Sequence, residues 1–406
     1  MQLRSLTAQV LLVGMFVSIN ACGSGNSGTD TSSLGSSSGG TGGEMGTSSS
    51  SSSGSSSGNG GAGGGASSSS SSSSSSGVGG GSAADTCAAD GSDNAYYLAP
   101  DGSDSAAGTN AAPWKTFSFA LKALKAGDTL CAHGGTYKER AQVGVVTPGA
   151  ANAPVRVLSV AGEKPVIQGL LWVKGADYWQ FHGINATWDA GNSHDEHMVK
   201  FTDGQNWEFA DAEVWGAESF AGILVAGVPS AWALRRLYVH DTADIGVTGH
   251  SVNQDHLIYV NAGIGGGVIE WSILIGSPNG RAVKIGPSSC GNGPIANVVV
   301  RYNTMVDNLG PSNVQFSCES HDNLAEWNLM VRPQSGRANV TGFSLTGANN
   351  VAKHNLGWES SEVVEMGSGV VDGGGNIMRD PLFVNEAMRD FHVNDAMAKQ
   401  YGAYAP

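Results

Sequence analysis

Short segments with alternating apolar and polar positions recur through the second half of the chain. In each, an apolar first and third residue flank a middle residue that varies, which is the period-two pattern of a β-strand. The copies return at intervals of about 20 to 40 residues, within the range that is typical of solenoids and propellers. They comprise residues 199–201, 223–225, 247–249, 283–285, 314–316, 343–345 and 364–366.

A second strand follows most of these copies and ends at a recurrent asparagine. Residues 297–303, 322–328 and 349–355 are close copies, and their last residues are Asn303, Asn328 and Asn355. Stacked asparagines can hydrogen-bond to one another and to the neighbouring backbone. A propeller blade needs four strands, whereas these repeats hold two or three short ones. We therefore predict an all-β fold, a right-handed parallel β-helix in which coils stack on one another.

The pattern near the start of the repeats is helical instead. Phe117, Ala120, Leu121 and Leu124 form an i, i+3, i+4, i+7 stripe, and Gly127 follows as a stop signal. We expect an amphipathic helix that caps the open apolar end of the solenoid.

The first residues indicate that the protein is exported. Arg4 precedes an apolar run at 11–17 that is too short to span a bilayer. The run leads to Ala21-Cys22, which resembles the lipobox of bacterial lipoproteins and implies lipidation of Cys22. Acyl chains there would anchor the protein without a spanning helix. Ordinary signal-peptidase cleavage nearby is the alternative. Residues 1–22 are thus predicted to be a lipoprotein-type signal, and an outer-membrane or cell-surface lipoprotein, or an extracellular protein, is expected.

Residues 23–84 are almost entirely serine, glycine and threonine. Such a segment cannot bury enough apolar surface to fold, so we interpret it as a disordered tether with a reach on the order of 45 Å. Residues 85–406 then form one β-helix domain. Their four cysteines, an even number in an exported chain, predict up to two disulfides, with Cys87–Cys131 and Cys290–Cys318 as the expected pairs.

Charge narrows the range of partners. The chain carries 35 acidic and 21 basic residues, a net charge of −14. This argues against a nucleic-acid partner, which requires a basic face. An acidic polysaccharide would require a bridging cation or a local basic cluster. We expect a monomer.

The order of these segments resembles secreted proteins of the pectate-lyase-like β-helix superfamily. The resemblance rests on the opening 96–104, the helix region and the late segments 380–384 and 390–393, and it covers roughly 85–406. It implies the fold. The superfamily includes lyases, hydrolases, epimerases and proteins without known catalysis, so it leaves the activity open.

With the strands in register, one outward column places a lysine at its centre. Lys284 would lie about 5 Å from its neighbours on the adjacent coils. An outward lysine is most often a solvated charge, but it can also act as a base in β-elimination. The column is expected to contain Lys200, Leu224, Thr248, Lys284, Gln315, Ser344 and Glu365, with His250 on the next column.

The segment 280–286, GRAVKIG, is similar to the catalytic coil of polysaccharide lyase family nine. That resemblance implies that Lys284 is the base and that Ca²⁺ is a cofactor, with Asp241 and Asp244 as remnants of its ligand cluster. His250 is a second catalytic candidate, although a lone histidine is usually structural. Lyase family six is less similar, because its arginine is replaced at Gln315.

Two functions follow from these expectations. The first is a surface-anchored lyase that cleaves a uronic-acid-containing, pectate-like polysaccharide, with Thr248, Gln315 and Lys200 binding substrate. The second is a non-catalytic β-helix that binds glycan or mediates cell-surface interactions. Hydrolysis is disfavoured because no adjacent carboxylate pair is present.

Overall fold

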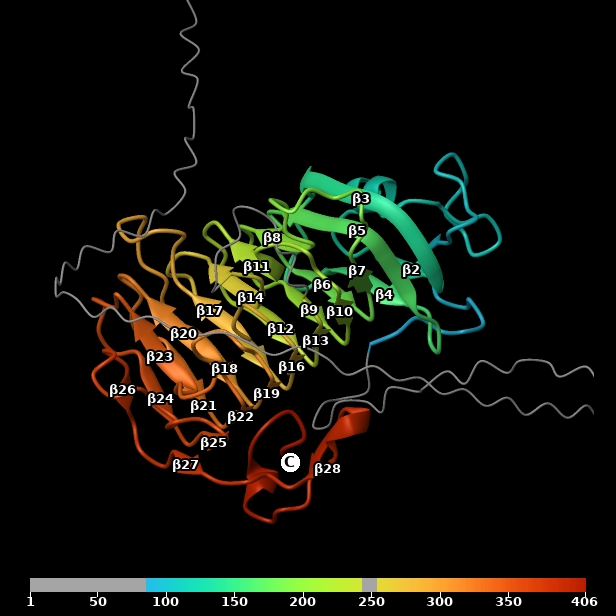
Figure 1. Ribbon diagram of the computed structural model, residues 1–406. Helices are drawn as coiled ribbons and strands as arrows, with labels where there is room; N and C mark the ends of the chain where they lie inside the picture. Colours follow the sequence, from blue (N-terminus) through green and yellow to red (C-terminus); the bar gives the residue numbers. More distant parts are fainter. Residues whose placement is uncertain (1–84, 243–253) are drawn as a thin grey trace, which may run out of the picture. The chain divides into compact units, whose positions relative to one another are not determined.

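The structure, a computed structural model, describes residues 85–242 and 254–406. Residues 1–84 and 243–253 lie outside the described part (Figure 1). The predicted signal, Cys22, the tether and the expected strand at 247–249 fall on these residues. All described residues belong to one compact unit, 76–406.

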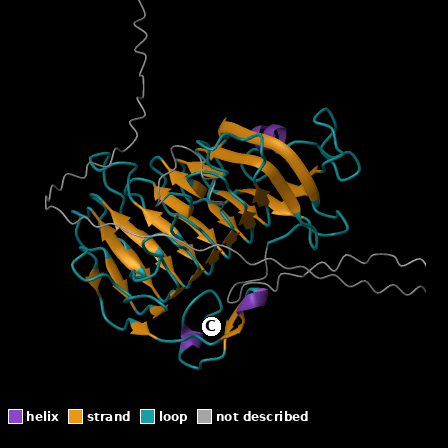
Figure 2. Ribbon diagram, in the orientation of Figure 1, coloured by secondary structure: helices purple, strands orange, loops and turns teal. Residues whose placement is uncertain are grey.

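The described chain winds into a parallel β-helix whose coils each contribute strands to three faces (Figures 1 and 2). We call these faces PB1, PB2 and PB3 in the order in which a coil passes through them. All pairings between the coils are parallel. The all-β parallel β-helix that the sequence predicts is therefore confirmed.

PB1 carries the lysine-containing segment. In chain order its strands are β3 (Gly135–Val145), β5 (Pro165–Lys174), β8 (Val199–Thr202), β11 (Ala221–Ala226), β14 (His256–Asn261), β17 (Val283–Ile285), β20 (Val314–Ser317) and β23 (Val340–Phe343).

PB2 is the continuous face next along each coil. Its strands are β1 (Tyr96–Leu98), β2 (Thr129–Ala132), β4 (Val155–Ser159), β6 (Trp179–His182), β9 (Glu208–Ala210), β12 (Trp232–Arg235), β15 (Gly267–Glu270), β18 (Val298–Arg301), β21 (Leu324–Glu326), β24 (Val351–Lys353) and β26 (Val371–Asp372).

PB3 completes each coil and joins PB1 at the long strand β5, which pairs with β7 through its first half and with β8 through its second. Its further strands are β7 (Asn185–Thr187), β10 (Glu213–Trp215), β13 (Tyr238–His240), β16 (Ile273–Ile275), β19 (Thr304–Val306), β22 (Leu329–Val331), β25 (Leu356–Trp358) and β27 (Ile377–Met378).

The core runs along the inside of the coils. Inward residues of successive strands stack, so Phe201 packs against Phe181, Phe209 and Trp207 at centroid distances of 5.4, 5.6 and 4.6 Å. All four are at most 1% exposed. This continuous apolar column stabilises each coil through its neighbours.

The N-terminal end of this core is covered by α1 (Phe117–Ala123). Phe117, Ala120 and Leu121 are fully buried, as the predicted stripe requires. Thr116 caps the helix by accepting a hydrogen bond from the Phe119 amide at 3.1 Å. The expected capping helix is confirmed.

The recurrent asparagines form an internal ladder between PB2 and PB3. The Asn328 side-chain amide donates to the Val300 carbonyl at 2.8 Å and to Asn355 Oδ1 at 3.0 Å. Its own Oδ1 accepts from the Asn303 amide at 3.0 Å. The ladder therefore satisfies backbone groups at a buried corner, which unpaired would destabilise the fold.

The last segment of the chain leaves the solenoid and covers the outer face of PB3. It contains the hairpin β28 (Phe383–Asn385) and β29 (Asp390–Val393) and two 3₁₀ turns, Glu386–Met388 and Ala398–Gln400. Phe391 and Tyr401 pack there against Ile273, Val306 and Leu329 in a second apolar cluster.

Candidate active site

Lys284 lies at the centre of PB1 and faces outward. Its neighbours Val283 and Ile285 are fully buried in the main core, so alternation directs the lysine to the outer surface. The register pairs Lys284 with Tyr259 on β14 and with Gln315 on β20.

These pairings extend over most of PB1. We call the outward residues of this register the lysine column. It contains Trp172, Lys200, Leu224, Tyr259, Lys284, Gln315 and Thr341, in that order along the helix axis. The column thus brings together Lys200, Lys284 and Gln315, as the sequence predicted.

Thr248 is not the neighbour of Lys284, which corrects the sequence-based register. Tyr259 occupies that position, and residues 243–253, which include Thr248, His250 and Asp244, lie outside the described part. The error has a physical origin. Strand β14 is buried over its first five residues and has an aromatic residue, Tyr259, at the outward position, so it lacks the apolar–polar alternation that marks the other copies.

The register is also wrong near the C-terminal end of PB1. Strand β23 ends at Phe343, and Thr341 rather than Ser344 pairs with Gln315. Phe343 is 61% exposed, so it is not an inward residue of a strand at 343–345. Glu365 does continue the column, because the Thr341 hydroxyl hydrogen-bonds to its carboxylate.

The surroundings of Lys284 are aromatic and largely buried. Its Nζ lies 4.4 Å from the centroid of the Tyr259 ring, within cation–π range. Tyr259 is 8% exposed and belongs to a small apolar cluster with Ala221 and Leu224, separate from the main core. Burial raises the pKa of the Tyr259 phenol, which therefore stays protonated at neutral pH.

Further basic groups lie beside this position. The Arg281 backbone amide donates to His256 Nδ1 at 3.1 Å, and both side chains are buried. Burial lowers the pKa of Arg281 to about 10. Burial first, and then the charges of Arg281, Lys284 and His197, hold the pKa of His256 well below its ordinary value. A neutral His256 therefore accepts the hydrogen bond.

Two buried polar atoms flank Lys284 on the column. Within residues 85–242 and 254–406, neither Tyr259 Oη nor Gln315 Oε1 has a hydrogen-bond partner. Gln315 is 2% exposed. Sequence reasoning included Gln315 but missed Tyr259, Arg281 and His256. The arginine had a signal, because it stands in the same short segment as Lys284.

Asp241 lies elsewhere. It follows β13 of PB3, and its carboxylate accepts hydrogen bonds from Arg389 at 2.8 and 2.9 Å and from the His240 ring at 2.8 Å. Burial would raise the pKa of Asp241, but these bonds and charges outweigh it and hold the pKa below its usual range. With this carboxylate engaged and Asp244 outside the described residues, the calcium site stays a prediction.

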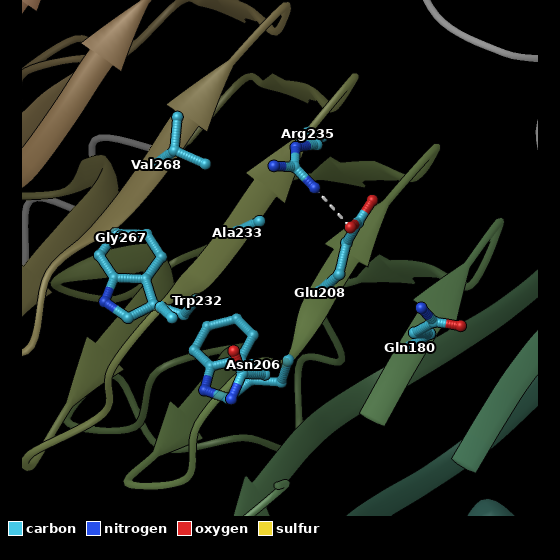
Figure 3. A pocket seen from close by; sticks show the side chains of 10 residues that line it. Gln180, Asn206, Glu208, Trp232, Ala233, Arg235, Gly267 and Val268 are labelled. Atoms are coloured by element: carbon cyan, nitrogen blue, oxygen red, sulfur yellow. Dashed lines mark hydrogen bonds and ion pairs between the residues drawn. The ribbon is translucent and has the colours of Figure 1, made fainter. Parts of the chain in front are cut away.

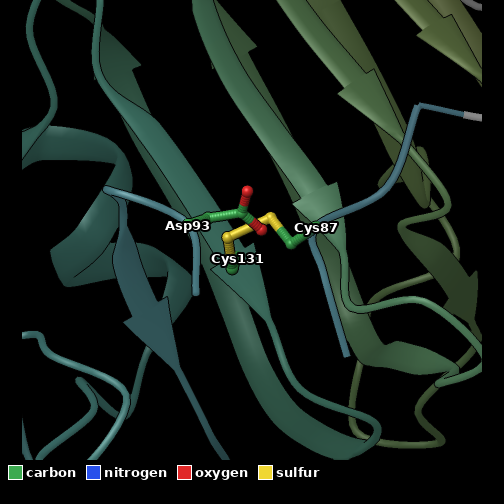
Figure 4. Close-up of side chains that lie close together, drawn as sticks. All are labelled: Cys87, Asp93 and Cys131. Carbon is green, nitrogen blue, oxygen red and sulfur yellow. A yellow bond between two sulfur atoms is a disulfide. The ribbon is translucent and has the colours of Figure 1, made fainter. Parts of the chain in front are cut away.

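In the described ranges one group of side chains of the types that bind metals lies close together. Two of its members are cysteines joined in a disulfide, so they offer no thiolate to a metal ion. Cys87 and Cys131, beside Asp93, form a disulfide with a sequence separation of 44 (Figure 4). A second disulfide joins Cys290 and Cys318. Both pairs are those that the sequence predicted.

A shallow hollow of about 410 Å³ lies on PB2, away from the lysine column (Figure 3). Glu208 and Arg235 lie on its floor and form an ion pair at 2.6 Å, and Arg235 also contacts Glu270. The charged groups of the hollow thus compensate one another. No helix among the described residues has the length and hydrophobicity of a membrane span.

The fold places this protein among the parallel β-helix proteins. Residues 96–262 match the family model described as Pel9A-like, right handed beta helix region. This part of the chain is therefore similar to a Pel9A-like β-helix region, and the predicted right-handed fold is confirmed.

Two similar proteins agree with this result. Pectate lyase PEL9 of Emericella nidulans is 33% identical over 119 residues, which are 29% of this chain and 27% of that protein. The chain thus matches about a quarter of the length of this curated relative. The crystal structure of pectate lyase Pel9A has a TM-score of 0.50 at 14% identity, over 79% of this chain and 90% of that one, and shows the shared fold.

Proposed function

We propose that the protein is a polysaccharide lyase that cleaves a uronic-acid-containing, pectate-like polysaccharide by β-elimination, with Lys284 as the base. The observation that carries this proposal is the position of Lys284. It faces outward at the centre of PB1, between Tyr259 and Gln315, and its charge and that of Arg281 both act on His256. The similarity of residues 96–262 to a Pel9A-like region supports the substrate class.

The reaction that this residue would catalyse is a β-elimination. The neutral Lys284 amine removes the proton from C5 of a uronate, and the electron pair forms the C4–C5 double bond. The C4–O4 bond breaks, and the leaving oxygen takes up a proton. General-base catalysis of this kind contributes about 10²- to 10⁴-fold.

The variant Lys284→Ala tests the proposal. With polygalacturonate, alginate and chondroitin as substrates, we expect wild type to form an unsaturated product that absorbs in the ultraviolet. The variant should lose at least about 100-fold in rate. Lys353→Ala is the matched control, because Lys353 lies on PB2 and pairs with Glu326 at 3.4 Å. Equal rates for wild type and Lys284→Ala would refute the assignment.

Calcium is a separate arm of the same experiment. We propose Ca²⁺ as a cofactor because the resemblance to family nine implies it. Parallel assays with added Ca²⁺ and with EDTA measure the dependence. Activity that survives EDTA would remove calcium from the proposal and leave Lys284 in place.

A non-catalytic glycan-binding module is the second candidate. The engagement of Asp241 by Arg389 favours it, because this carboxylate then serves structure and not a metal. Binding of a polyuronate without product formation, in wild type and with Ca²⁺ present, would support this module.

The disulfides indicate folding in an oxidising compartment, and hence export. We further propose that a lipid on Cys22 anchors the exported chain. Cells that express Cys22→Ser should release the protein from the membrane fraction, as followed by immunoblot. A wild-type protein that is already soluble would contradict the anchor.

A further inference from the structure

Lys200 carries a half-buried charge, and no carboxylate of the described residues forms an ion pair with it. It lies on β8 in the lysine column, between Trp172 and Leu224. Four other lysines of the described ranges form an ion pair with an acid: Lys138 with Asp189, Lys164 with Glu213, Lys174 with Asp203 and Lys353 with Glu326. Lys115, Lys122, Lys125 and Lys399 have no such pair there but are exposed, so Lys200 differs from them by its burial.

The electrostatic surroundings of Lys200 are one-sided. Burial, and then the positive charge of Lys174, lower the pKa of Lys200, and no acid in the described part of the chain offsets them. In a chain of net charge −14 a nearby carboxylate would be easy to supply. Its absence beside a half-buried cation is the pattern expected of a site that receives its anion from a ligand.

Trp172 fixes the position of this ammonium. The Lys200 Nζ lies 5.1 Å from the Trp172 ring centroid, and the indole Nε1 donates to the His197 carbonyl at 2.5 Å. Burial, and then the charge of Lys200, lower the pKa of His197 to about 4. This histidine is therefore neutral near pH 7 and adds no competing charge. The cation is held in place but not neutralised.

The lysine column also sets the distance between Lys200 and Lys284, the proposed base. Lys200 and Lys284 are separated by three coil steps, through Leu224 and Tyr259. At the usual spacing of strands this is about 14 Å along the helix axis. A polyuronate that follows the column from Lys284 would thus present a carboxylate of a sugar several units away from the cleaved bond.

We propose that Lys200, positioned by Trp172, binds a carboxylate of the polysaccharide at a remote subsite, and that the chain therefore runs along the helix axis toward the N-terminal coils. This inference rests on the proposed function, because it takes a polyuronate as the ligand. It assigns Lys200 to binding and not to the chemical step. Long acidic oligosaccharides should gain affinity from this subsite, and short ones should not.

The test measures binding without turnover. Galacturonate oligomers of increasing length are titrated by calorimetry into full-length Lys284→Ala, with and without Lys200→Gln. Glutamine keeps most of the stem against Trp172 and removes the charge. We expect long oligomers to bind about 10-fold or more weakly, because a hydrogen bond to a charged group is lost. The shortest oligomers should bind equally, and Lys200→Arg should restore the loss.

Lys353→Gln in the same background is the control for net charge and should bind all lengths as the parent does. An equal loss at every length, or no loss at all, would overturn the remote subsite. If wild type binds oligomers in a Lys200-dependent way but forms no product, the lyase proposal fails and this one stands. If neither galacturonate nor alginate oligomers bind, both fail.

Discussion

At the residue scale, the outer face of PB1 gathers ionisable groups away from water. His256 is 3% exposed, and it faces Arg281, Lys284 and His197. A cation at His256 would add to the positive charge of this region, so the fold favours its neutral form. The same packing that builds the candidate site thus makes the stability of the protein depend on pH.

This dependence has a defined sign. Because folding lowers the pKa of His256, the unfolded chain binds its proton first as the pH falls below about 6.5. The contribution of His256 to the free energy of unfolding should therefore be fully present above this pH and should decrease as the pH falls below it. His256→Gln should reduce the slope by at most about 1.4 kcal/mol per pH unit. Denaturation with urea between pH 7 and pH 5 measures both slopes, and parallel curves would contradict the prediction.

At the scale of an element, each coil depends on its neighbours for buried hydrogen bonds. The asparagine ladder is internal, and Asn303, Asn328 and Asn355 are fully buried. One member hydrogen-bonds to the coil on either side, so its substitution removes hydrogen bonds to two coils. The repeat that is visible in the sequence is therefore also the unit of stability.

Removal of the middle asparagine measures this coupling. Asn328→Ala leaves the Val300 carbonyl and the Asn303 amide without their partners. At about 1 to 3 kcal/mol for each of the two buried groups, we expect the free energy of unfolding to fall by about 2 to 6 kcal/mol. Asn292→Ala, which removes hydrogen bonds only in an exposed loop, is the control. Similar urea midpoints for the two variants would show that the ladder adds little.

At the scale of the whole molecule, the C-terminal segment closes an apolar face that the solenoid leaves open. Its attachment combines apolar packing with the ion pair between Arg389 and Asp241. Arg389 also contacts the Tyr238 hydroxyl at 3.0 Å. A residue predicted to bind metal thus serves to dock one part of the chain on another.

Loss of this ion pair should loosen the segment locally. The pair is partly exposed, so Arg389→Gln should cost about 1 kcal/mol and speed amide exchange in β29 about 5-fold. The strands of PB2 should keep their protection, because they do not contact the segment through this arginine. Unchanged exchange in β29 would show that apolar packing alone holds it. Arg301→Gln, on PB2, is the matched control.

The sequence by itself determined the fold class, the capping helix and the outward direction of Lys284, and its even number of cysteines indicated disulfides, whose pairing the structure decided. These features follow from the apolar–polar period within each segment, from its repetition along the chain and from the number of cysteines, all of which can be read without knowing which segments contact one another. Only the tertiary structure decided which residues meet. Coil lengths vary and β14 lacks alternation, so the sequence could not identify Tyr259 as the neighbour of Lys284. Nor could it reveal that Asp241 pairs with Arg389, 148 residues away, because such a contact depends on how the last segment folds back onto PB3.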